Sequence, residues 1–518
     1  MSEKKKIAKA AGIVGSATLL SRVLGLIRDQ VTAYYFGAGV EADAFFVAFR
    51  IPNLLRRLLA EGALTASFIP IFSEYLTTRS RAEAVSLARA ALTFFSLVLL
   101  LATILGIVSS SWLIRVFAPG FVDDPYKFQL TVTLTQVMFP YIFLVGLLAL
   151  AMGILNSLDK FAGPALAPVF LNLGMILTVF FLYRFFDPPI MALAAGALIG
   201  GVMQLLVQVP YLAGQGGFIG LNFNFKHPAL KRIVLLMAPA TLGAAAYQIS
   251  VFINTLLASY LPLGSVSYLY YADRIMQFPL GVFAVAMGTA VLPSMSRQAA
   301  ANDLKALKST LSYSLRLVSF ITIPAAVGMI VLSEPIIRLL FQRGQFDLAA
   351  SQATAEALIA YAVGLWSLSA VQVLARVFYS LKDTLTPVKI SIVSLATNAV
   401  LCLILMWPLK HTGLALASSG GSVVNFILLT VFLRRRLGTL DGRRMLASLA
   451  RNCLCAALMG AVVYATSRGL AMTLPEGTTL LAAQTGVGTL VGMGMYVGLS
   501  LVFKDPELKA LIKTLRKR

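Results

Sequence analysis

The sequence has few charged residues, few histidines and few cysteines, and each shortage excludes a class of protein. Only 12% of its 518 residues are charged, about half of the roughly 25% typical of soluble domains, which excludes a soluble globular protein. The two histidines, His227 and His411, lie far apart in predicted loops and predict no metal site. The three cysteines all fall in apolar stretches and predict no disulfide framework.

Long apolar runs, by contrast, recur from one end of the chain to the other, and 58% of the residues are hydrophobic. A helix needs about 20 apolar residues to cross the hydrocarbon core of a bilayer. The pattern therefore predicts an all-α integral membrane protein with fourteen transmembrane helices. The predicted spans are residues 11–35, 43–73, 84–111, 130–156, 163–183, 189–212, 233–260, 266–292, 312–333, 351–379, 387–407, 413–433, 446–467 and 480–503.

The distribution of basic residues predicts the orientation of these spans. An even number of spans places both termini on the same side, and the loops are rich in Lys and Arg on alternate sides. Few of the 43 basic residues fall in the predicted outer loops, which are the loops that hold Arg115, Lys127, Arg184, Arg338, Arg343, Lys410 and Arg468. The positive-inside rule then predicts cytoplasmic termini. The net charge of +22 is explained by topology, and its scatter among spans does not favour a nucleic-acid partner.

The chain also contains an internal repeat with a constant offset of 223 residues. The matching blocks are Pro70 and Ser73 with Pro293 and Ser296, Ile114-Arg115 with Ile337-Arg338, Ser157-Leu158 with Ser380-Leu381, Pro164 with Pro387, and Ala192-Leu193-Ala194 with Ala415-Leu416-Ala417. Each repeat holds six spans, so the copies are predicted to be parallel, with substrate bound between them. The predicted parts are a first lobe (1–225), a second lobe (226–440), a helix pair (441–503) and a basic cytoplasmic tail (504–518).

The first predicted helix has one polar face inside an apolar span. Within an arc of about 120° on a helical wheel lie Ser21, Arg22, Gly25, Arg28, Asp29 and Thr32. A charge at the bilayer centre costs roughly 2.5–3.5 kcal/mol, so these residues are predicted to line a solvated cavity. The alternative is that Asp29 neutralises one of the arginines and the pair only fixes helix packing.

The second helix and its counterpart in the second lobe repeat this pattern. One stripe of the second helix holds Asp43, Arg50, Asn53, Arg57 and Glu61. Pro52 interrupts the helix, so the wheel does not decide whether Arg56 or Arg57 faces inward. One repeat later, Asp273 and Arg274 lie within an apolar helix. Because guanidinium groups bind diphosphate oxygens bidentately, arginines from both lobes predict an anionic substrate.

Several of these motifs resemble the MurJ (MviN) family of lipid II flippases, within the multidrug/oligosaccharidyl-lipid/polysaccharide exporter superfamily. The motifs are Ser21-Arg22-Val23-Leu24-Gly25, Arg28-Asp29, Ala42-Asp43-Ala44-Phe45-Phe46, Ile51-Pro52-Asn53-Leu54-Leu55-Arg56-Arg57, Ala60-Glu61-Gly62-Ala63 and Tyr270-Tyr271-Ala272-Asp273-Arg274. The resemblance covers nearly the whole chain. It implies two six-helix lobes in a V, followed by a helix pair that forms a lipid-binding groove.

The resemblance also implies a function and a set of site residues. The substrate would be undecaprenyl-diphosphate carrying the peptidoglycan precursor, moved from the cytoplasmic to the outer leaflet of the bacterial inner membrane by alternating access, without catalysis. The implied cationic cavity uses Arg22, Arg28, Arg56 and Arg274, which favours Arg56 over Arg57. The polar residues expected beside them are Ser21, Asp29, Asp43, Asn53, Glu61 and Asp273, and the expected hinges are Gly25 and Pro52.

Other functions remain to be weighed against this one. A drug exporter of the same superfamily would line its cavity with carboxylates and aromatic rings instead of arginines, whereas a flippase for another polyprenyl-diphosphate glycan would share the cationic cavity. A membrane enzyme would need a metal-binding cluster. No cofactor is predicted, and no Walker motif is present. The predicted energy source is the membrane potential or an H⁺ or Na⁺ gradient, with Asp29, Asp43, Asp273 and Glu356 as candidate coupling acids. Membrane lipids and other cell-wall synthesis proteins are the further predicted partners.

Overall fold

The structure is a computed structural model that describes residues 3–57, 64–509 and 512, with side chains throughout except at 3–11, 66 and 238–247. The described residues are nearly all helical, and no β-strand occurs among them. This confirms the predicted all-α class. Contacts between residues divide the chain into two units, Met1–Gly264 (unit 1) and Ser265–Arg518 (unit 2).

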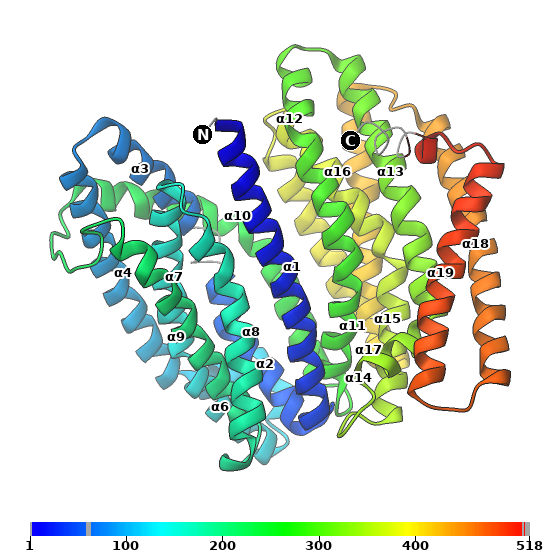
Figure 1. Cartoon of the computed structure of the whole chain (residues 1–518), viewed down its shortest axis with the longest axis horizontal. Helices are drawn as coiled ribbons and strands as arrows, with labels where there is room; N and C mark the ends of the chain where they lie inside the picture. Colours follow the sequence, from blue (N-terminus) through cyan, green and yellow to red (C-terminus); the bar gives the residue numbers. More distant parts are fainter. Residues whose placement is uncertain (1–2, 58–63, 510–511, 513–518) are drawn as a thin grey trace. The chain divides into compact units, whose positions relative to one another are not determined.

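Unit 1 is a bundle of helices, most of them joined by short turns, with a longer segment, 214–227, between α9 and α10 (Figure 1). Its helices are α1 (Glu3–Phe36), α2 (Val40–Leu55), α3 (Thr65–Thr78), α4 (Arg81–Val108), α5 (Ser110–Phe117), α6 (Pro125–Met138), α7 (Pro140–Ser157), α8 (Ala162–Leu182), α9 (Met191–Ala213) and α10 (Pro228–Ser259), with 3₁₀ turns η2 (Pro119–Phe121) and η3 (Tyr183–Phe185). α8 and α9 lie side by side (Figure 1). A Cβ on Gly174 of α8 would lie only 2.4 Å from the Cα of Gly200 of α9. Small residues at such a contact let two membrane helices approach closely.

Unit 2 contains α11 (Ser265–Pro279), the π turn η4 (Leu280–Val285), α12 (Ala286–Ala300), α13 (Leu304–Val331), α14 (Ser333–Phe341), α15 (Leu348–Val363), α16 (Leu365–Ser380), α17 (Leu385–Leu437), α18 (Gly442–Thr473) and α19 (Thr478–Val502). One apolar core joins α12, α13, α16 and α17 around Leu311, Leu374 and Leu429. A second core includes Phe320, Met459 and Tyr496 and fixes α18 and α19 against α13.

The membrane spans follow from length and composition. Within the described ranges, nine helical segments are long and apolar enough to cross a membrane, or ten if α15 and α16, which meet at a 41° bend, form one span. Large apolar side chains on these segments are exposed, such as Leu101 and Leu105 of α4 and Leu490 of α19, as expected for contact with lipid. The chain is therefore an integral, multi-pass membrane protein.

The predicted count of fourteen is compatible with these helices and stays a prediction. α17 has 53 residues and contains a non-helical residue, Lys410, so it holds two of the predicted spans, 387–407 and 413–433. α1, α10 and the pair α2 and α3 correspond to three more predicted spans. Part of the predicted span 43–73, residues 58–63, lies outside the described residues.

The internal repeat is visible in the helix boundaries. α4 begins at Arg81 and α13 at Leu304, 223 residues later, and both are 28 residues long. Asp124 caps α6 by accepting a hydrogen bond from the Lys127 N–H (3.0 Å), and Asp347 caps α15 in the same way from the Ala350 N–H (2.7 Å). At matching positions after α7 and α16, Asp159 and Lys382 have left-handed φ values of 58° and 59°. These local features confirm the duplication that the sequence predicts.

The units and the predicted lobes divide the chain at different residues. The repeat starts its second copy before α10, whereas α10 has its contacts in unit 1, with α3, α4, α5 and η2. The predicted boundaries at 225, 440 and 503 follow sequence similarity and not contacts, so they stay a prediction.

Candidate functional site

The polar face of α1 is joined to α8 through Arg28. The Arg28 side chain is buried and donates to Asp29 Oδ1 from Nε (3.0 Å) and from Nη2 (2.6 Å). Its Nη1 donates to Asn172 Oδ1 of α8 (3.1 Å), and the Asn172 amide donates in turn to the Ser21 carbonyl oxygen (3.0 Å). The sequence alone leaves open whether Asp29 pairs with an arginine; in the structure Asp29 pairs with Arg28.

Arg22 has a different environment on the same helix face. It lies nearly two turns before Arg28, and its side chain is exposed, whereas Arg28 and Asp29 are 7% and 1% exposed. Gly25, between them, is buried and leaves the surface of α1 without a side chain at that turn. α1 therefore presents one arginine that is held by protein partners and one whose side chain is exposed.

Arg50 lies within α2, and Arg56 and Arg57 directly follow its last residue, Leu55. Pro52 lies inside α2 and has no N–H to donate, and the chain forms a π turn at 56–57. Arg56 is half-buried and donates from Nε to Asn53 Oδ1 (3.0 Å), while Arg57 is exposed. Arg50 donates to the Thr255 hydroxyl of α10. The predicted Glu61 lies outside the described residues.

Asp43 belongs to a buried ion pair in unit 1. Its Oδ2 accepts from Lys127 Nζ of α6 (3.0 Å) and from the Gly264 backbone N–H (3.0 Å), and both charged side chains are under 10% exposed. The Lys127 ammonium also lies 3.9 Å from the centre of the Phe121 ring, a favourable cation–π distance. The sequence analysis placed Lys127 in an outer loop; the structure places it in the first turn of α6.

In unit 2 the polar stretch of α11 is held by an aromatic cluster. Tyr271 is fully buried, with its ring 4.9 Å from that of Phe341 and 5.3 Å from that of Phe346. On the same helix, Asp273 accepts a hydrogen bond from the Gln277 amide. Asp273 and Arg274 are both half-buried. The packing of Tyr271 therefore fixes the helix turn that carries Arg274.

The structure thus brings together only some of the predicted site residues. Ser21, Arg28 and Asp29 meet around Asn172, and Asn53 meets Arg56. Two partners were missed by sequence reasoning: Asn172, whose only signal is an amide within an apolar span, and Lys127. Among the described residues, no cluster of three or more His, Cys, Asp or Glu could hold a metal ion. What the arrangement offers chemically is guanidinium groups within membrane helices, which suit phosphate oxygens.

The fold itself is that of a known class of membrane transporter. A solved multidrug-resistance MATE transporter of the MOP superfamily, in an inward-facing conformation, matches the chain with a TM-score of 0.67, covering 83% of this chain and 99% of that one. The two sequences are 16% identical, so this likeness concerns the fold alone. The chain therefore has the same fold as that transporter.

Closer relatives define the family. The family model described as lipid II flippase MurJ matches residues 32–481. The lipid II flippase MurJ of Burkholderia cenocepacia is 39% identical over 427 residues, 82% of this chain and 83% of the relative. A solved lipid II flippase MurJ in an inward closed conformation matches with a TM-score of 0.80 and 28% identity, covering 95% of this chain and 99% of that chain. The chain belongs to the MurJ family of lipid II flippases, which confirms the resemblance described above.

Proposed function

We propose that this protein is a lipid II flippase, which moves the undecaprenyl-diphosphate-linked peptidoglycan precursor from the cytoplasmic to the outer leaflet by alternating access. It makes and breaks no covalent bond in this role and is a transporter, not an enzyme. Membership of the MurJ family over residues 32–481 carries the proposal. The arginines of α1 support it, because an apolar helix tolerates such charges only for a specific purpose.

We propose that Arg22, Arg28, Arg56 and Arg274 bind the diphosphate and the adjoining sugars. Arg22 is the first contact, since its guanidinium is exposed. Arg28 is held in a defined direction by Asp29 and Asn172, so little conformational entropy is lost when it binds an anion. The role proposed for Ser21, Asp29, Asn53, Glu61 and Asp273 is to hold or neutralise these arginines between transport cycles. Asp43 is proposed to act in the same site through its pair with Lys127, and Gly25 and Pro52 are the proposed hinges.

The same proposal assigns the polyprenyl tail to α18 and α19. These helices pack against each other and against α13. Large apolar side chains such as Leu454, Leu490 and Met493 are exposed on them. An exposed apolar surface suits a long isoprenoid chain that stays in the lipid phase.

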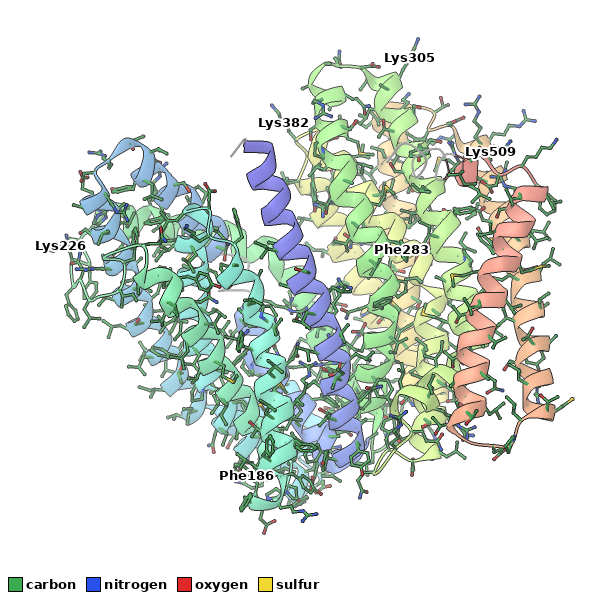
Figure 2. The ribbon with its side chains drawn as sticks, viewed as in Figure 1. Phe186, Lys226, Phe283, Lys305, Lys382 and Lys509 are labelled. Carbon is green, nitrogen blue, oxygen red and sulfur yellow. The ribbon has the colours of Figure 1, made fainter. Side chains whose placement is uncertain are left out.

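The proposed location is the bacterial inner membrane with both termini in the cytoplasm. Within unit 2, Figure 2 shows Lys305, Lys382 and Lys509 at the same end of the helices. A cluster of basic residues at one end agrees with the positive-inside rule. Fusing a reporter that is active only in the cytoplasm to each terminus tests the orientation, which is wrong if either fusion is inactive.

The proposed energy source is the membrane potential or an H⁺ or Na⁺ gradient, and no cofactor is part of the proposal. Collapsing the potential and the two gradients one at a time in cells that depend on this protein identifies the source. Continued flipping after all three are collapsed would contradict the proposal.

The decisive test is depletion and rescue in a bacterium whose own lipid II flippase can be switched off. The expected result is that this chain restores growth and the appearance of lipid II in the outer leaflet. Arg22→Ala should abolish both while leaving protein levels unchanged. Arg443→Ala, which removes an exposed arginine in the first turn of α18, is the matched control and should retain activity.

Two outcomes of this test would contradict the proposal. A chain that inserts into the membrane but never delivers lipid II to the outer leaflet is not a lipid II flippase. Activity for a different polyprenyl-diphosphate glycan alone would assign the protein to the alternative that shares a cationic cavity.

A further inference from the structure

The segment between α9 and α10 exposes an unusual row of apolar side chains. Ile219, Leu221, Phe223 and Phe225 are 49%, 71%, 63% and 45% exposed. They occupy every second position of this irregular segment. Four large apolar side chains on one connecting segment require a covering surface.

Two other residues of the same segment, Phe218 and Asn222, bind to unit 1 and hold the backbone of the segment in place. The Phe218 ring is fully buried and lies 5.9 Å from that of Phe72. Asn222 donates from its backbone N–H to Thr93 Oγ1 (2.9 Å) and from its side chain to the Ser86 carbonyl oxygen (3.1 Å) and hydroxyl (3.0 Å). These contacts hold the segment against unit 1 and leave the side chains of Ile219, Leu221 and Phe223 on its exposed side.

The contacts with α4 give the level of the segment along that membrane span. Arg89 Nε donates to the Gly217 carbonyl oxygen (2.7 Å), and no charged residue follows Arg89 in α4. The uncharged part of α4, 90–108, spans roughly 28 Å at 1.5 Å per residue, close to the hydrocarbon thickness of about 30 Å. The hydrocarbon layer therefore begins just after Arg89.

The apolar row lies at that same level. Asn222 binds Thr93, and the Phe225 ring lies 6.2 Å from that of Phe94, which are the residues where the uncharged part of α4 begins. The chain enters the segment from the membrane span α9 and leaves it into α10. Both its contacts and its attachments therefore hold it at the boundary between lipid headgroups and acyl chains.

The charges at the end of the segment select the type of headgroup. Lys226 and Lys231 are exposed, and Figure 2 shows Lys226 at the edge of unit 1. Of the carboxylates on the neighbouring helices, Glu74 is paired with Arg232 (2.8 Å). Glu83 accepts from the Ser80 hydroxyl (3.2 Å) and keeps its charge, but Arg81 and Arg89, which bind carbonyl oxygens before the apolar row, outnumber it. The residual charge beside the apolar row is positive, which favours anionic lipids.

We infer that residues 219–225 form a membrane-inserted edge: the four apolar side chains enter the acyl region beside α4, and Lys226 and Lys231 bind anionic headgroups. Apolar side chains flanked by lysines are the general composition of interfacial membrane anchors. This inference does not depend on which molecule the protein transports, because it concerns only the seating of unit 1 in the bilayer.

Nitroxide labels on single cysteines test the insertion. In full-length protein with Cys402, Cys453 and Cys455 replaced by alanine, labels are placed at 221, 223 and 225, with 224 and 226 as matched controls. The protein is reconstituted into vesicles of phosphatidylethanolamine and phosphatidylglycerol. Collision rates with oxygen, which concentrates in acyl chains, and with a water-soluble nickel chelate are then compared. The expected result is a higher oxygen-to-nickel ratio at 221, 223 and 225 than at 224 and 226.

A second comparison isolates the lysines. Lys226→Gln with Lys231→Gln should shift the label at 223 toward water in vesicles that contain phosphatidylglycerol. The same change should have little effect in vesicles of phosphatidylcholine alone, because those lack a net negative surface charge.

Three outcomes would overturn the inference. One is nickel accessibility at all five labelled positions. Another is an equal shift in both vesicle types, which would remove the anionic-lipid part. The third is protection of the labels from both reagents in native membranes but not in purified vesicles, which would assign the apolar row to a protein partner.

Discussion

The two repeats share their helix caps and turns but differ in their buried charges. The caps Asp124 and Asp347 are 223 residues apart, and so are Asp159 and Lys382, the left-handed residues. The buried pair of Asp43 and Lys127 in unit 1 has no such counterpart. At the offset of 224 that aligns Arg50 with Arg274, Asp43 corresponds to Ser267, and at 223 Lys127 corresponds to Ala350. Both of these residues are buried.

This difference distinguishes the residues that are needed to form the helix bundle from residues that serve another purpose in one copy. Residues that set backbone geometry are present in both copies, because a helix must start and end at the same places for the bundle to form. The second copy folds with serine and alanine where the first buries two charges. The buried pair of Asp43 and Lys127 is therefore not needed to form this arrangement of helices, and it adds a property that is specific to unit 1.

Removing Arg28 should have the largest effect. Arg28→Ala leaves the Asp29 carboxylate buried without its guanidinium partner, which costs about 4 kcal/mol, and it should abolish transport. Adding Asp29→Asn should restore most of the stability but none of the transport. Thermal unfolding in detergent and the lipid II assay measure the two effects separately. If the double variant transports, Arg28 serves only to neutralise Asp29.

Removing Lys127 should have the next largest effect. Lys127→Ala should lower stability by about 3 kcal/mol, because the Asp43 carboxylate keeps its bond from the Gly264 N–H but loses the ammonium group. Introducing the residues of the second repeat together, Asp43→Ser with Lys127→Ala, should recover most of this loss in the same unfolding assay. A double variant as unstable as the single one would show that the bundle needs the pair of Asp43 and Lys127 in order to fold.

The tail after α19 has no counterpart in unit 1 and gives a pH-dependent prediction. Asp505 and Glu507 are both 1% exposed and bind Arg451 at 2.7 and 2.8 Å, while Glu507 also accepts from Arg316 (2.5 Å). Burial alone would raise the pKa of Asp505, but hydrogen bonds from Glu507 and Arg451 outweigh burial and lower it. Burial and the neighbouring Asp505 raise the pKa of Glu507.

The directions of these two pKa shifts determine how the stability of the fold should depend on pH. A lowered carboxyl pKa stabilises the fold above the unfolded-state pKa of about 4 and loses that contribution as the pH falls. Asp505→Asn should therefore cost about 2 kcal/mol at neutral pH and progressively less below pH of about 4. The raised pKa of Glu507 has the opposite sign, because stability falls as the pH rises through it. Unfolding midpoints of the wild type and the variant across this pH range test the profile, and a constant difference would contradict it.

The helix caps should give the smallest effect and the closest agreement between repeats. Asp124→Ala and Asp347→Ala each remove one bond to an N–H in the first turn of a helix, which costs about 1 kcal/mol. The two losses should be equal within the error of thermal unfolding measurements. A large loss for Asp124 and none for Asp347 would mean that the duplicated caps no longer have the same role.

The sequence predicts the spans and the repeat because these depend on local composition and on a constant offset. It also identifies Asp29 as a candidate partner for an arginine, since the two residues share one helix face. It does not predict Asn172, which is 144 residues from Arg28 in the chain, and it assigns Lys127 to a loop because the predicted span begins only at residue 130. The contacts of Arg28 with Asn172 and of Asp43 with Lys127 each join two different helices, so neither produces a periodic pattern in the sequence of one helix.

The arginines after Pro52 show a second limit. A helical wheel assumes 100° per residue, whereas the π turn at 56–57 changes the direction of the side chains that follow it. The half-buried position of Arg56 and the exposed position of Arg57 therefore could not be obtained from the wheel. The resemblance favours Arg56 because a match between motifs does not assume a regular helix.

The close approach of α8 and α9 has a genetic consequence. A Cβ at Gly200 would lie 2.8 Å from the Leu171 carbonyl oxygen, immediately before Asn172, which binds Arg28. A bulky side chain at Gly200 would act as a wedge between α8 and α9, displacing Asn172 and, through it, the guanidinium of α1. Because the nearest atoms, the Leu171 carbonyl oxygen and Cα, belong to the backbone, transport defects caused at this glycine should not be suppressed by shortening side chains in α8.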